Sequence, residues 1–247
     1  MHYIYGFHAV REAWLNSDRS IEALYIMPNA EKGFQDTLAQ ANSASIKRPR
    51  PIMTEKQKIE KMLPRGAVHQ GLAIKCKPLE ETDLRDYIIK SDSKTHMRLV
   101  MLDQVTDPHN IGAIIRSACA FGIDGIIMQK KHAPALDGVL AKAACGGIEH
   151  IPVTYVTNLN RAIEELQDSF FSVFGLDSEA QYEINNVPAN EKLLMIFGAE
   201  GKGMRHSLRE KCDFMVKLPT CGPIASLNVS NAAAVTFFTT SQFNKDC

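Results

Sequence analysis

Residues 218–235 read LPTCGPIASLNVSNAAAV, and they continue an apolar stretch, residues 213–218, that has the pattern of a strand. Pro219, Gly222 and Pro223 do not suit the interior of a strand or a helix, so the backbone must turn there. The Ala-rich residues at the end of the stretch favour a helix. We therefore predict a strand, a bent loop and a helix, in that order.

The start of this helix is expected at Ser226, Asn228 or Ser230, because all three are good N-cap residues. The free N–H groups of a helix N-terminus form a site for a polar ligand. The same pattern is typical of an ordinary strand-to-helix connection, which is the better interpretation of this stretch alone. Two loops of the same kind upstream favour a functional interpretation instead.

The first of these loops, residues 103–116, reads DQVTDPHNIGAIIR. Asn110 is a plausible N-cap for the following helix, and Gly112 would let another backbone approach closely. Arg116 lies within that helix among apolar neighbours. It is either a salt-bridged surface residue or a buried one. We expect it to be buried, and a buried arginine normally has an anionic partner.

The second loop, residues 195–204, reads MIFGAEGKGM and carries three glycines after an apolar strand. Glycines permit positive φ and close contact between the backbone and a ligand. The spacing matches neither a Walker phosphate loop nor a dinucleotide-binding motif. Glu200 in the middle would repel a phosphate, so the loop suits a hydroxyl or a guanidinium instead.

The overall composition is that of an ordinary soluble globular protein, with 247 residues, 45% of them apolar and 23% charged. No apolar run approaches the length of a membrane span, and residues 1–6 have no signal-peptide pattern. The six cysteines are scattered, without the spacing of a zinc site. We expect reduced thiols in a cytoplasmic protein and no bound metal.

Charge is distributed unevenly along the chain, although the formal net charge is zero. Residues 1–78 contain 12 Lys and Arg against 7 Asp and Glu, an excess of +5. The remainder contains 16 against 21, an excess of −5. This asymmetry predicts an anionic partner for the first part.

The pattern of helices and strands predicts two α/β domains. Residues 1–78 alternate short helices and strands and are expected to form a small unit, followed by a linker over residues 79–96. Residues 97–247 alternate longer strands with helices, as in a Rossmann-like parallel sheet covered on both faces. Ligands of such sheets bind at the carboxyl ends of the strands. Strands are expected at 99–102, 125–128, 151–156, 170–174, 193–197 and 214–218.

The three loops together resemble the motifs of the TrmH/SpoU family of RNA ribose 2′-O-methyltransferases, which belongs to the SPOUT class. Two further stretches, residues 5–10 and 146–153, are similar to the RlmB-like subgroup, which acts on a guanosine of large-subunit ribosomal RNA. The first family motif, N-x-G-x-x-x-R, is met by Asn110, Gly112 and Arg116. The second, G-x-E-x-x-G, is met by Gly198, Glu200 and Gly203. The third, S-L-N-V-S, is met by residues 226–230.

This resemblance implies a specific fold and cofactor. The C-terminal part of the sheet would form a trefoil knot, a rare exception to the rule against knotted chains. S-adenosyl-L-methionine would bind there in contact with Gly198, Leu218 and Leu227. The family works as a homodimer with the active site at the subunit interface. The N-terminal unit would resemble the small RNA-binding domains of some ribosomal proteins, in agreement with its basic excess.

The implied reaction transfers a methyl group to a ribose 2′-hydroxyl of ribosomal RNA. Arg116 is often described as the base in this family, but deprotonating a guanidinium near neutral pH would cost roughly 7 kcal/mol. Our hypothesis is that Arg116 binds the neighbouring phosphate and stabilises the developing alkoxide. Glu200 would then orient Arg116 or a hydroxyl, with Asn110 beside it in the first motif. Ser226 and Asn228 would hold the ribose or the loop.

Two alternatives remain open from the sequence. The enzyme could act on transfer RNA instead, or the chain could be a non-catalytic RNA-binding or ribosome-assembly protein. The intact set of motif residues favours an enzyme. The target nucleotide is expected in a loop, because duplex RNA hides its base edges.

Overall fold

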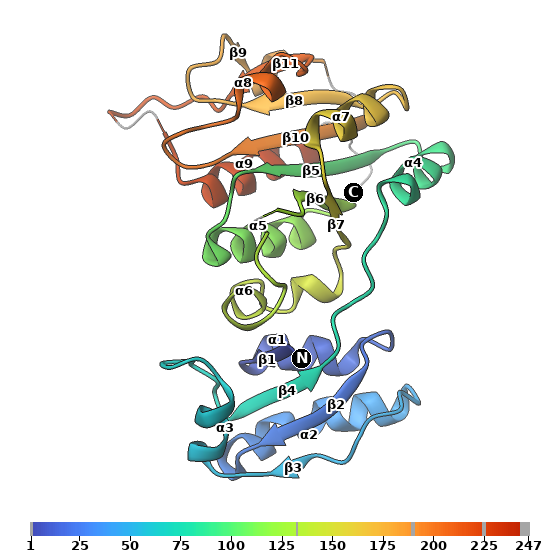
Figure 1. Cartoon of the computed structure of the whole chain (residues 1–247), viewed down its shortest axis with the longest axis vertical. Helices are drawn as coiled ribbons and strands as arrows, with labels where there is room; N and C mark the ends of the chain where they lie inside the picture. Colours follow the sequence, from blue (N-terminus) through green and yellow to red (C-terminus); the bar gives the residue numbers. More distant parts are fainter. Residues whose placement is uncertain (1, 132, 189–190, 224–225, 243–247) are drawn as a thin grey trace. The chain divides into compact units, whose positions relative to one another are not determined.

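The computed structural model of the chain describes residues 2–131, 133–188, 191–223 and 226–242 (Figure 1). The chain divides into two compact units. The first comprises residues 1–80 together with residues 135–150, and the second comprises residues 81–134 and 151–247. The chain therefore enters the first unit a second time, between two strands of the second unit.

The first unit contains a four-stranded sheet with the order β1-β4-β2-β3. Strands β1 and β2 run antiparallel to β4, whereas β3 pairs in parallel with β2 at the edge. Short β1 and β3 were not expected from the sequence. The strands are β1 (His2–Tyr5), β2 (Ile21–Ile26), β3 (Ile52–Met53) and β4 (Leu72–Cys76).

Helices pack against this sheet through short apolar faces. Helix α1 buries Val10, Ala13 and Trp14, and α2 begins directly after β2 with Pro28 at its first position. Helix α2 has 16 residues, because the chain turns directly from strand to helix at this proline. The helices are α1 (Phe7–Leu15), α2 (Pro28–Ser43), α3 (Lys56–Met62), α6 (Gly138–Ala143) and the 3-10 helix η1 (Gly147–Glu149).

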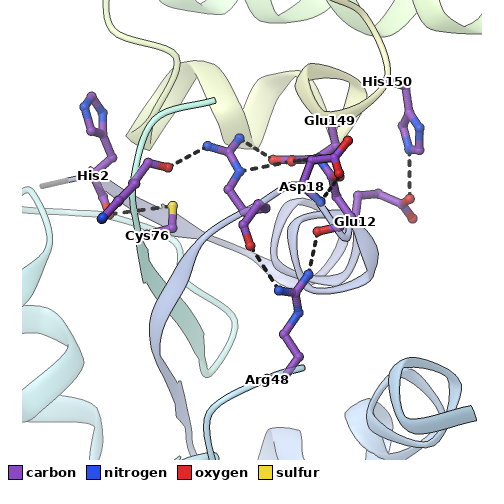
Figure 2. A network of polar contacts seen from close by, with 10 residues as sticks. His2, Glu12, Asp18, Arg48, Cys76, Glu149 and His150 are labelled. Atoms are coloured by element: carbon purple, nitrogen blue, oxygen red, sulfur yellow. Dashed lines mark hydrogen bonds and ion pairs between the residues drawn. The ribbon is translucent and has the colours of Figure 1, made fainter. Parts of the chain in front are cut away.

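The re-entrant segment 135–150 is held in the first unit by a buried ion pair (Figure 2). Arg19 Nη2 lies 2.6 Å from Glu149 Oε1, and Arg19 Nε donates to Glu149 Oε2 at 3.1 Å. Asn16 Nδ2 also donates to this carboxylate, at 2.8 Å. Gly146 has a φ of +92°, and a Cβ there would lie 2.3 Å from the side chain of Glu12. The segment thus needs both the carboxylate and the glycine to pack against α1.

The second unit contains a seven-stranded, all-parallel sheet with the order β7-β6-β5-β10-β8-β11-β9. This confirms the predicted α/β class with a parallel sheet. The six expected strands are present with shifts of up to two residues at their ends, and β9 is an additional short edge strand. The strands are β5 (Met97–Asp103), β6 (Gly125–Gln129), β7 (Val153–Val156), β8 (Ser172–Leu176), β9 (Tyr182–Glu183), β10 (Lys192–Gly198) and β11 (Phe214–Lys217).

Helices cover both faces of this sheet (Figure 1). One face, with Leu99 and Ile196, packs against α4, α7 and α8. The opposite face carries α5 and α9, where the rings of Phe197 and Phe237 meet edge to face at 5.8 Å. The stretch expected to be a linker, residues 79–96, includes α4, which begins with a capping box at Asp83. The helices are α4 (Leu84–Ser93), α5 (Pro108–Ala120), α7 (Leu159–Gln167), α8 (His206–Arg209), α9 (Val229–Ser241) and the 3-10 helix η2 (Ile184–Asn186).

The order of the strands decides where a ligand can bind. Strand β5 is followed in sequence by β6 on one side, but its neighbour on the other side is β10. The carboxyl ends of β5, β10, β8 and β11 lie next to one another, and this is the edge at which open parallel sheets bind ligands. None of the helices in the described ranges is long and apolar enough to cross a membrane.

Candidate active site

Three loops from distant parts of the sequence meet at these carboxyl ends. Asn110 Nδ2 donates to Glu200 Oε1 at 3.1 Å, and Asn228 Nδ2 donates to Asn110 Oδ1 at 3.1 Å. Asn228 Nδ2 also donates to Glu200 Oε1. One residue of each motif thus takes part in a closed set of hydrogen bonds, which we call the loop cluster. Its carboxylate, Glu200, is exposed.

The loop cluster lies at the N-termini of two helices. Asn228 is the N-cap of α9, and its Oδ1 accepts from the backbone N–H of Ser230 at 2.9 Å. This confirms one of the three N-caps expected from the sequence. Asn110 lies in the first turn of α5, whose N-cap is Asp107 rather than Asn110. The Glu200 carboxylate accepts from the N–H of Val229 at 3.4 Å, where the α9 dipole stabilises a negative charge.

The glycine loop after β10 folds tightly on itself. Ala199 and Gly203 form an isolated antiparallel bridge, and Gly201 and Gly203 have φ values of +76° and +67°. A Cβ on Gly198 would lie 2.3 Å from the backbone of Gly203 and Met204. Gly201 and Gly203 need glycine because of their positive φ, and Gly198 because the loop closes on its backbone. The closed loop presents Glu200 to the two asparagines.

An ion pair that was not expected from the sequence holds the end of this loop. Asp103, the last residue of β5, is fully buried and accepts from the backbone N–H of Arg205 at 2.9 Å and from its Nε at 2.8 Å. Arg205 Nη2 also donates to Gln129 at 3.2 Å. Asp103 lies opposite Gly198 in the sheet. An acidic residue directly after the apolar run 99–102 is the signal that would have indicated this anchor.

A cavity of about 720 Å³ opens beside the loop cluster. Such a volume suits a nucleoside-sized ligand. All three residues expected to contact the cofactor, Gly198, Leu218 and Leu227, line it, as do Glu200, Ser226 and Asn228. Asp177 and Glu179, at the end of β8, add carboxylates that were not predicted.

The chemistry of this lining fits S-adenosylmethionine. Apolar side chains such as Phe197, Val216 and Leu218 can cover an adenine ring. The nearby backbone and carboxylate groups can bind the ribose hydroxyls and the ammonium group. Within the described ranges, no group of three His, Cys, Asp or Glu residues has the arrangement of a metal site.

The expectation that Arg116 is buried is wrong. Its neighbours Ile114 and Ile115 are fully buried, but Arg116 falls on the exposed face of α5 together with His109 and Ala120. It neither lines the cavity nor forms an ion pair or hydrogen bond with any described residue. Helical periodicity explains the difference, because a run of apolar neighbours does not bury every position of a helix.

Comparison with known proteins places both units in one family. Residues 97–238 match the model of the SpoU rRNA Methylase family, and residues 3–82 match the RNA 2′-O ribose methyltransferase substrate-binding model. YacO of Bacillus subtilis, assigned to the TrmH family of tRNA/rRNA methyltransferases, is 37% identical over 96% of this chain and 93% of its own length. The 23S rRNA (guanosine-2′-O-)-methyltransferase RlmB of Vibrio vulnificus is 36% identical over 96% and 94%.

Solved structures show the same fold at low sequence identity. The SpoU methyltransferase AviRb of Streptomyces viridochromogenes, in complex with the cofactor AdoMet, has a TM-score of 0.77 at 20% identity, over 97% of this chain and 89% of that one. An AdoMet-bound rRNA methyltransferase of Sinorhizobium meliloti has a TM-score of 0.76 at 19% identity, over 98% and 87%.

The fold and the two family models together define an RNA methyltransferase of the SPOUT class. The chain belongs to the SpoU rRNA methylase family, with the family's substrate-binding domain at its N-terminus.

Proposed function

We propose that the chain transfers the methyl group of S-adenosylmethionine to a ribose 2′-hydroxyl of ribosomal RNA, at a guanosine of the large subunit. The observation that carries this proposal is the loop cluster, in which Asn110, Glu200 and Asn228 meet beside the cavity. The choice of nucleotide is supported by the relative RlmB, whose 36% identity extends over both units.

The proposed cofactor site uses Gly198, Leu218 and Leu227. Leu218 and Leu227 offer apolar contact to the adenine, while Gly198 lets the backbone of the glycine loop close against the end of β10. The bound cofactor supplies an electrophilic methyl group on a sulfonium. The lining residues exclude water from that group and leave the loop cluster as the polar side of the cavity.

The loop cluster is proposed to orient the ribose. Glu200 is exposed, and the hydrogen bonds that it accepts from described residues all end on Oε1, so Oε2 can accept a hydrogen bond from a hydroxyl. Ser226 lines the cavity and offers a further hydroxyl. When the 2′-oxygen attacks the methyl carbon, the carbon–sulfur bond breaks and the hydroxyl proton must leave. An oriented carboxylate favours that departure.

Arg116 is proposed to bind the phosphate beside the target ribose. It is exposed and has no ion-pair partner within the described part of the chain, so its guanidinium is available for a bidentate contact. It would stabilise the developing alkoxide as a permanent cation rather than act as a base.

We further infer that the enzyme is a cytoplasmic homodimer with a trefoil knot at the cofactor site. The dimer is supported by α9, where Val235 and Phe238 remain 43% and 55% exposed beside α5, which carries Arg116. A second copy packed on this face would cover apolar surface next to Arg116. The knot is supported by family membership and by two separate loops that line one cavity, the first through residues 198–203 and the second through Leu218, Thr220, Ser226, Leu227 and Asn228.

The main alternative is a transfer RNA substrate, since YacO is assigned to a family that acts on both RNAs. A non-catalytic role is a second alternative, which the complete loop cluster disfavours.

Methyl transfer from labelled S-adenosylmethionine to unmodified 23S rRNA, 16S rRNA and tRNA tests the proposal. We expect incorporation into 23S rRNA alone, and digestion to nucleosides should give 2′-O-methylguanosine. Label in tRNA alone would establish the alternative, and no label in any RNA with cofactor bound would establish the non-catalytic role. Arg116→Lys should lower both turnover and RNA affinity, and full activity in this variant would refute the phosphate contact.

A further inference from the structure

We propose that one defined face of the first unit binds the phosphate backbone of the substrate RNA. This inference rests on the proposed function and specifies where the substrate is held. The face, which we call the basic edge, comprises five cations around edge strand β3 and helix α3. They are Lys47, Arg50, Lys58, Lys61 and Arg65.

The basic edge carries the whole charge excess of the N-terminal region. Residues 47–65 contain seven Lys and Arg against two Asp and Glu, an excess of +5. Residues 1–78 have twelve against seven, so five of each sign are left outside this segment. The excess seen in the sequence is therefore a local feature of one segment, and local concentration of cations is the electrostatic footprint of a nucleic-acid site.

These cations are free to bind an anion. All five are exposed, and none has an ion-pair partner within the described part of the chain. Their neighbour Lys56 differs, because it pairs with Glu60 at 3.5 Å. When a protein cation neutralises a phosphate, counterions that are condensed on the RNA are released. An unpaired cation can do so without first breaking an ion pair within the protein.

The segment that bears the cations is rigidly anchored at both ends. Arg48 Nη1 donates to the carbonyl of Arg19 at 3.0 Å (Figure 2). Arg48 Nε donates to the carbonyl of Trp14 at 2.7 Å, and the guanidinium lies 5.7 Å from the Trp14 ring. This anchoring turns Arg48 inward between Lys47 and Arg50. Burial lowers the pKa of Arg48 below its ordinary value, yet a guanidinium stays charged near neutral pH.

At its other end, the segment is fixed by the sheet and the core. The N–H of Thr54 donates to the carbonyl of Ile26 at 2.9 Å, and Ile59 and Leu63 of the α3 region pack in the core with Tyr5. Lys58 and Lys61, three residues apart, share the exposed side of α3. A fixed backbone lowers the ordering cost of binding.

Apolar side chains within the basic edge favour RNA over other anions. Ile52 and Met53 of β3 are 39% and 47% exposed and lie between Arg50 and Lys58 in the sequence. Unstacked bases of loops can rest on apolar side chains while the backbone contacts the surrounding cations. An acidic protein partner would meet the same cations, and it is the competing outcome of the test below.

The test compares charge-matched double variants of the full chain. Lys47→Gln with Arg50→Gln and Lys58→Gln with Lys61→Gln each remove two charges from the basic edge. Lys32→Gln with Lys77→Gln removes two exposed charges elsewhere on the same unit. Binding to a fluorescent 23S rRNA fragment is measured by anisotropy at several salt concentrations, methylation of the same fragment is measured separately with labelled S-adenosylmethionine, and cofactor binding is measured by calorimetry.

We expect each basic-edge pair to lower the slope of log affinity against log salt by about 1.4 to 1.8 and to weaken RNA binding at least about tenfold. The control pair should bind RNA like the wild type, and all variants should bind S-adenosylmethionine equally. If the basic-edge pairs bind RNA no worse than the control, the inference is overturned, and an acidic protein becomes the candidate partner. If the wild type methylates no RNA at all, the proposed function fails instead.

Discussion

Two carboxylates of this chain, Glu149 and Glu200, lie in opposite surroundings. The Glu149 side chain is fully buried and its partner Arg19 is 2% exposed, so the ion pair is closed to solvent and ligands. The Glu200 side chain is exposed beside a cavity, and its described donors are two amides and a backbone N–H rather than a cation. All the described interactions of Glu149 are within the protein, whereas the exposed carboxylate of Glu200 can also bind a substrate.

Burial and the charge of the partner therefore distinguish a carboxylate that stabilises the fold from one that can bind a ligand. A buried charge must find its partner within the protein, because desolvation without a partner is very costly. An exposed carboxylate held by neutral donors is oriented without being neutralised. The two regions should therefore respond differently to the loss of their carboxylates.

The largest expected effect is the loss of stability in Glu149→Ala. This change leaves Arg19 buried without its carboxylate and should cost about 3–5 kcal/mol in the free energy of unfolding. Trp14 is the single tryptophan of the chain and lies buried in the first unit, so its fluorescence in a urea titration reports this unit.

The control is Glu165→Ala in the second unit, whose unfolding is followed by circular dichroism; it removes an ion pair with the exposed Arg161 and should cost less than about 1 kcal/mol. Equal losses in the two variants would show that the buried pair is not the structural anchor.

The second effect is a loss of catalysis without a loss of fold in Glu200→Ala. Removing the carboxylate frees the two asparagines and should lower methyl transfer on the order of 100-fold, since misplacement of a reacting group by about 1 Å has effects of that size. The thermal midpoint, followed by circular dichroism, should shift by only a few degrees. Unchanged turnover in a single-turnover assay would exclude Glu200 from the site.

A smaller effect is expected at Gly198. In Gly198→Ala the new Cβ would meet the backbone of Gly203 and Met204, at a cost of about 1–3 kcal/mol, which should appear as weaker cofactor binding in calorimetry. Gly222→Ala is the control, because a Cβ there meets no atom within 4 Å and its φ is not positive. Similar cofactor affinities in both variants would mean that closure of the glycine loop does not shape the site.

The smallest effect concerns thiol reactivity. Burial raises the pKa of Cys76 in the first unit and of Cys212 in the second to about 11 and about 12, whereas Cys221 is exposed near the site. At pH 8, iodoacetamide should label Cys221 first and leave the two buried thiols unmodified, as peptide mapping would reveal.

The raised pKa values of Cys76 and Cys212 also determine how the stability of the fold depends on pH. Because the folded pKa values lie above the unfolded ones, the buried thiols stabilise the fold fully below about pH 8.5 and progressively less as the pH rises toward 11. Rapid labelling of Cys76 at pH 8 would contradict the closed sheet around it.

Much of the second unit could be predicted from the sequence. The apolar strands after residue 97 and the three motif loops indicated a parallel sheet with its site at the carboxyl ends, and Asn110, Glu200 and Asn228 indeed meet there. Motifs and strand patterns are local, and in a parallel sheet they determine which loop ends lie at one edge.

Other features depend on contacts that local patterns do not encode. The re-entry of residues 135–150 into the first unit depends on the pairing of Arg19 with Glu149, which are 130 residues apart. The exposure of Arg116 depends on the exact phase of α5, and the Asp103–Arg205 ion pair joins the end of β5 to the start of α8, 102 residues later. These three features could therefore be recognised only from the tertiary structure.

The decisive experiment is a calorimetric titration of S-adenosylmethionine into the full chain, since the glycine loop and the loop before α9 are proposed to form one cofactor cavity beside Asn110. We expect one molecule bound per chain and weakened binding in Gly198→Ala but not in Glu165→Ala. Absence of binding by the folded wild type, or equal binding in all three proteins, would contradict it.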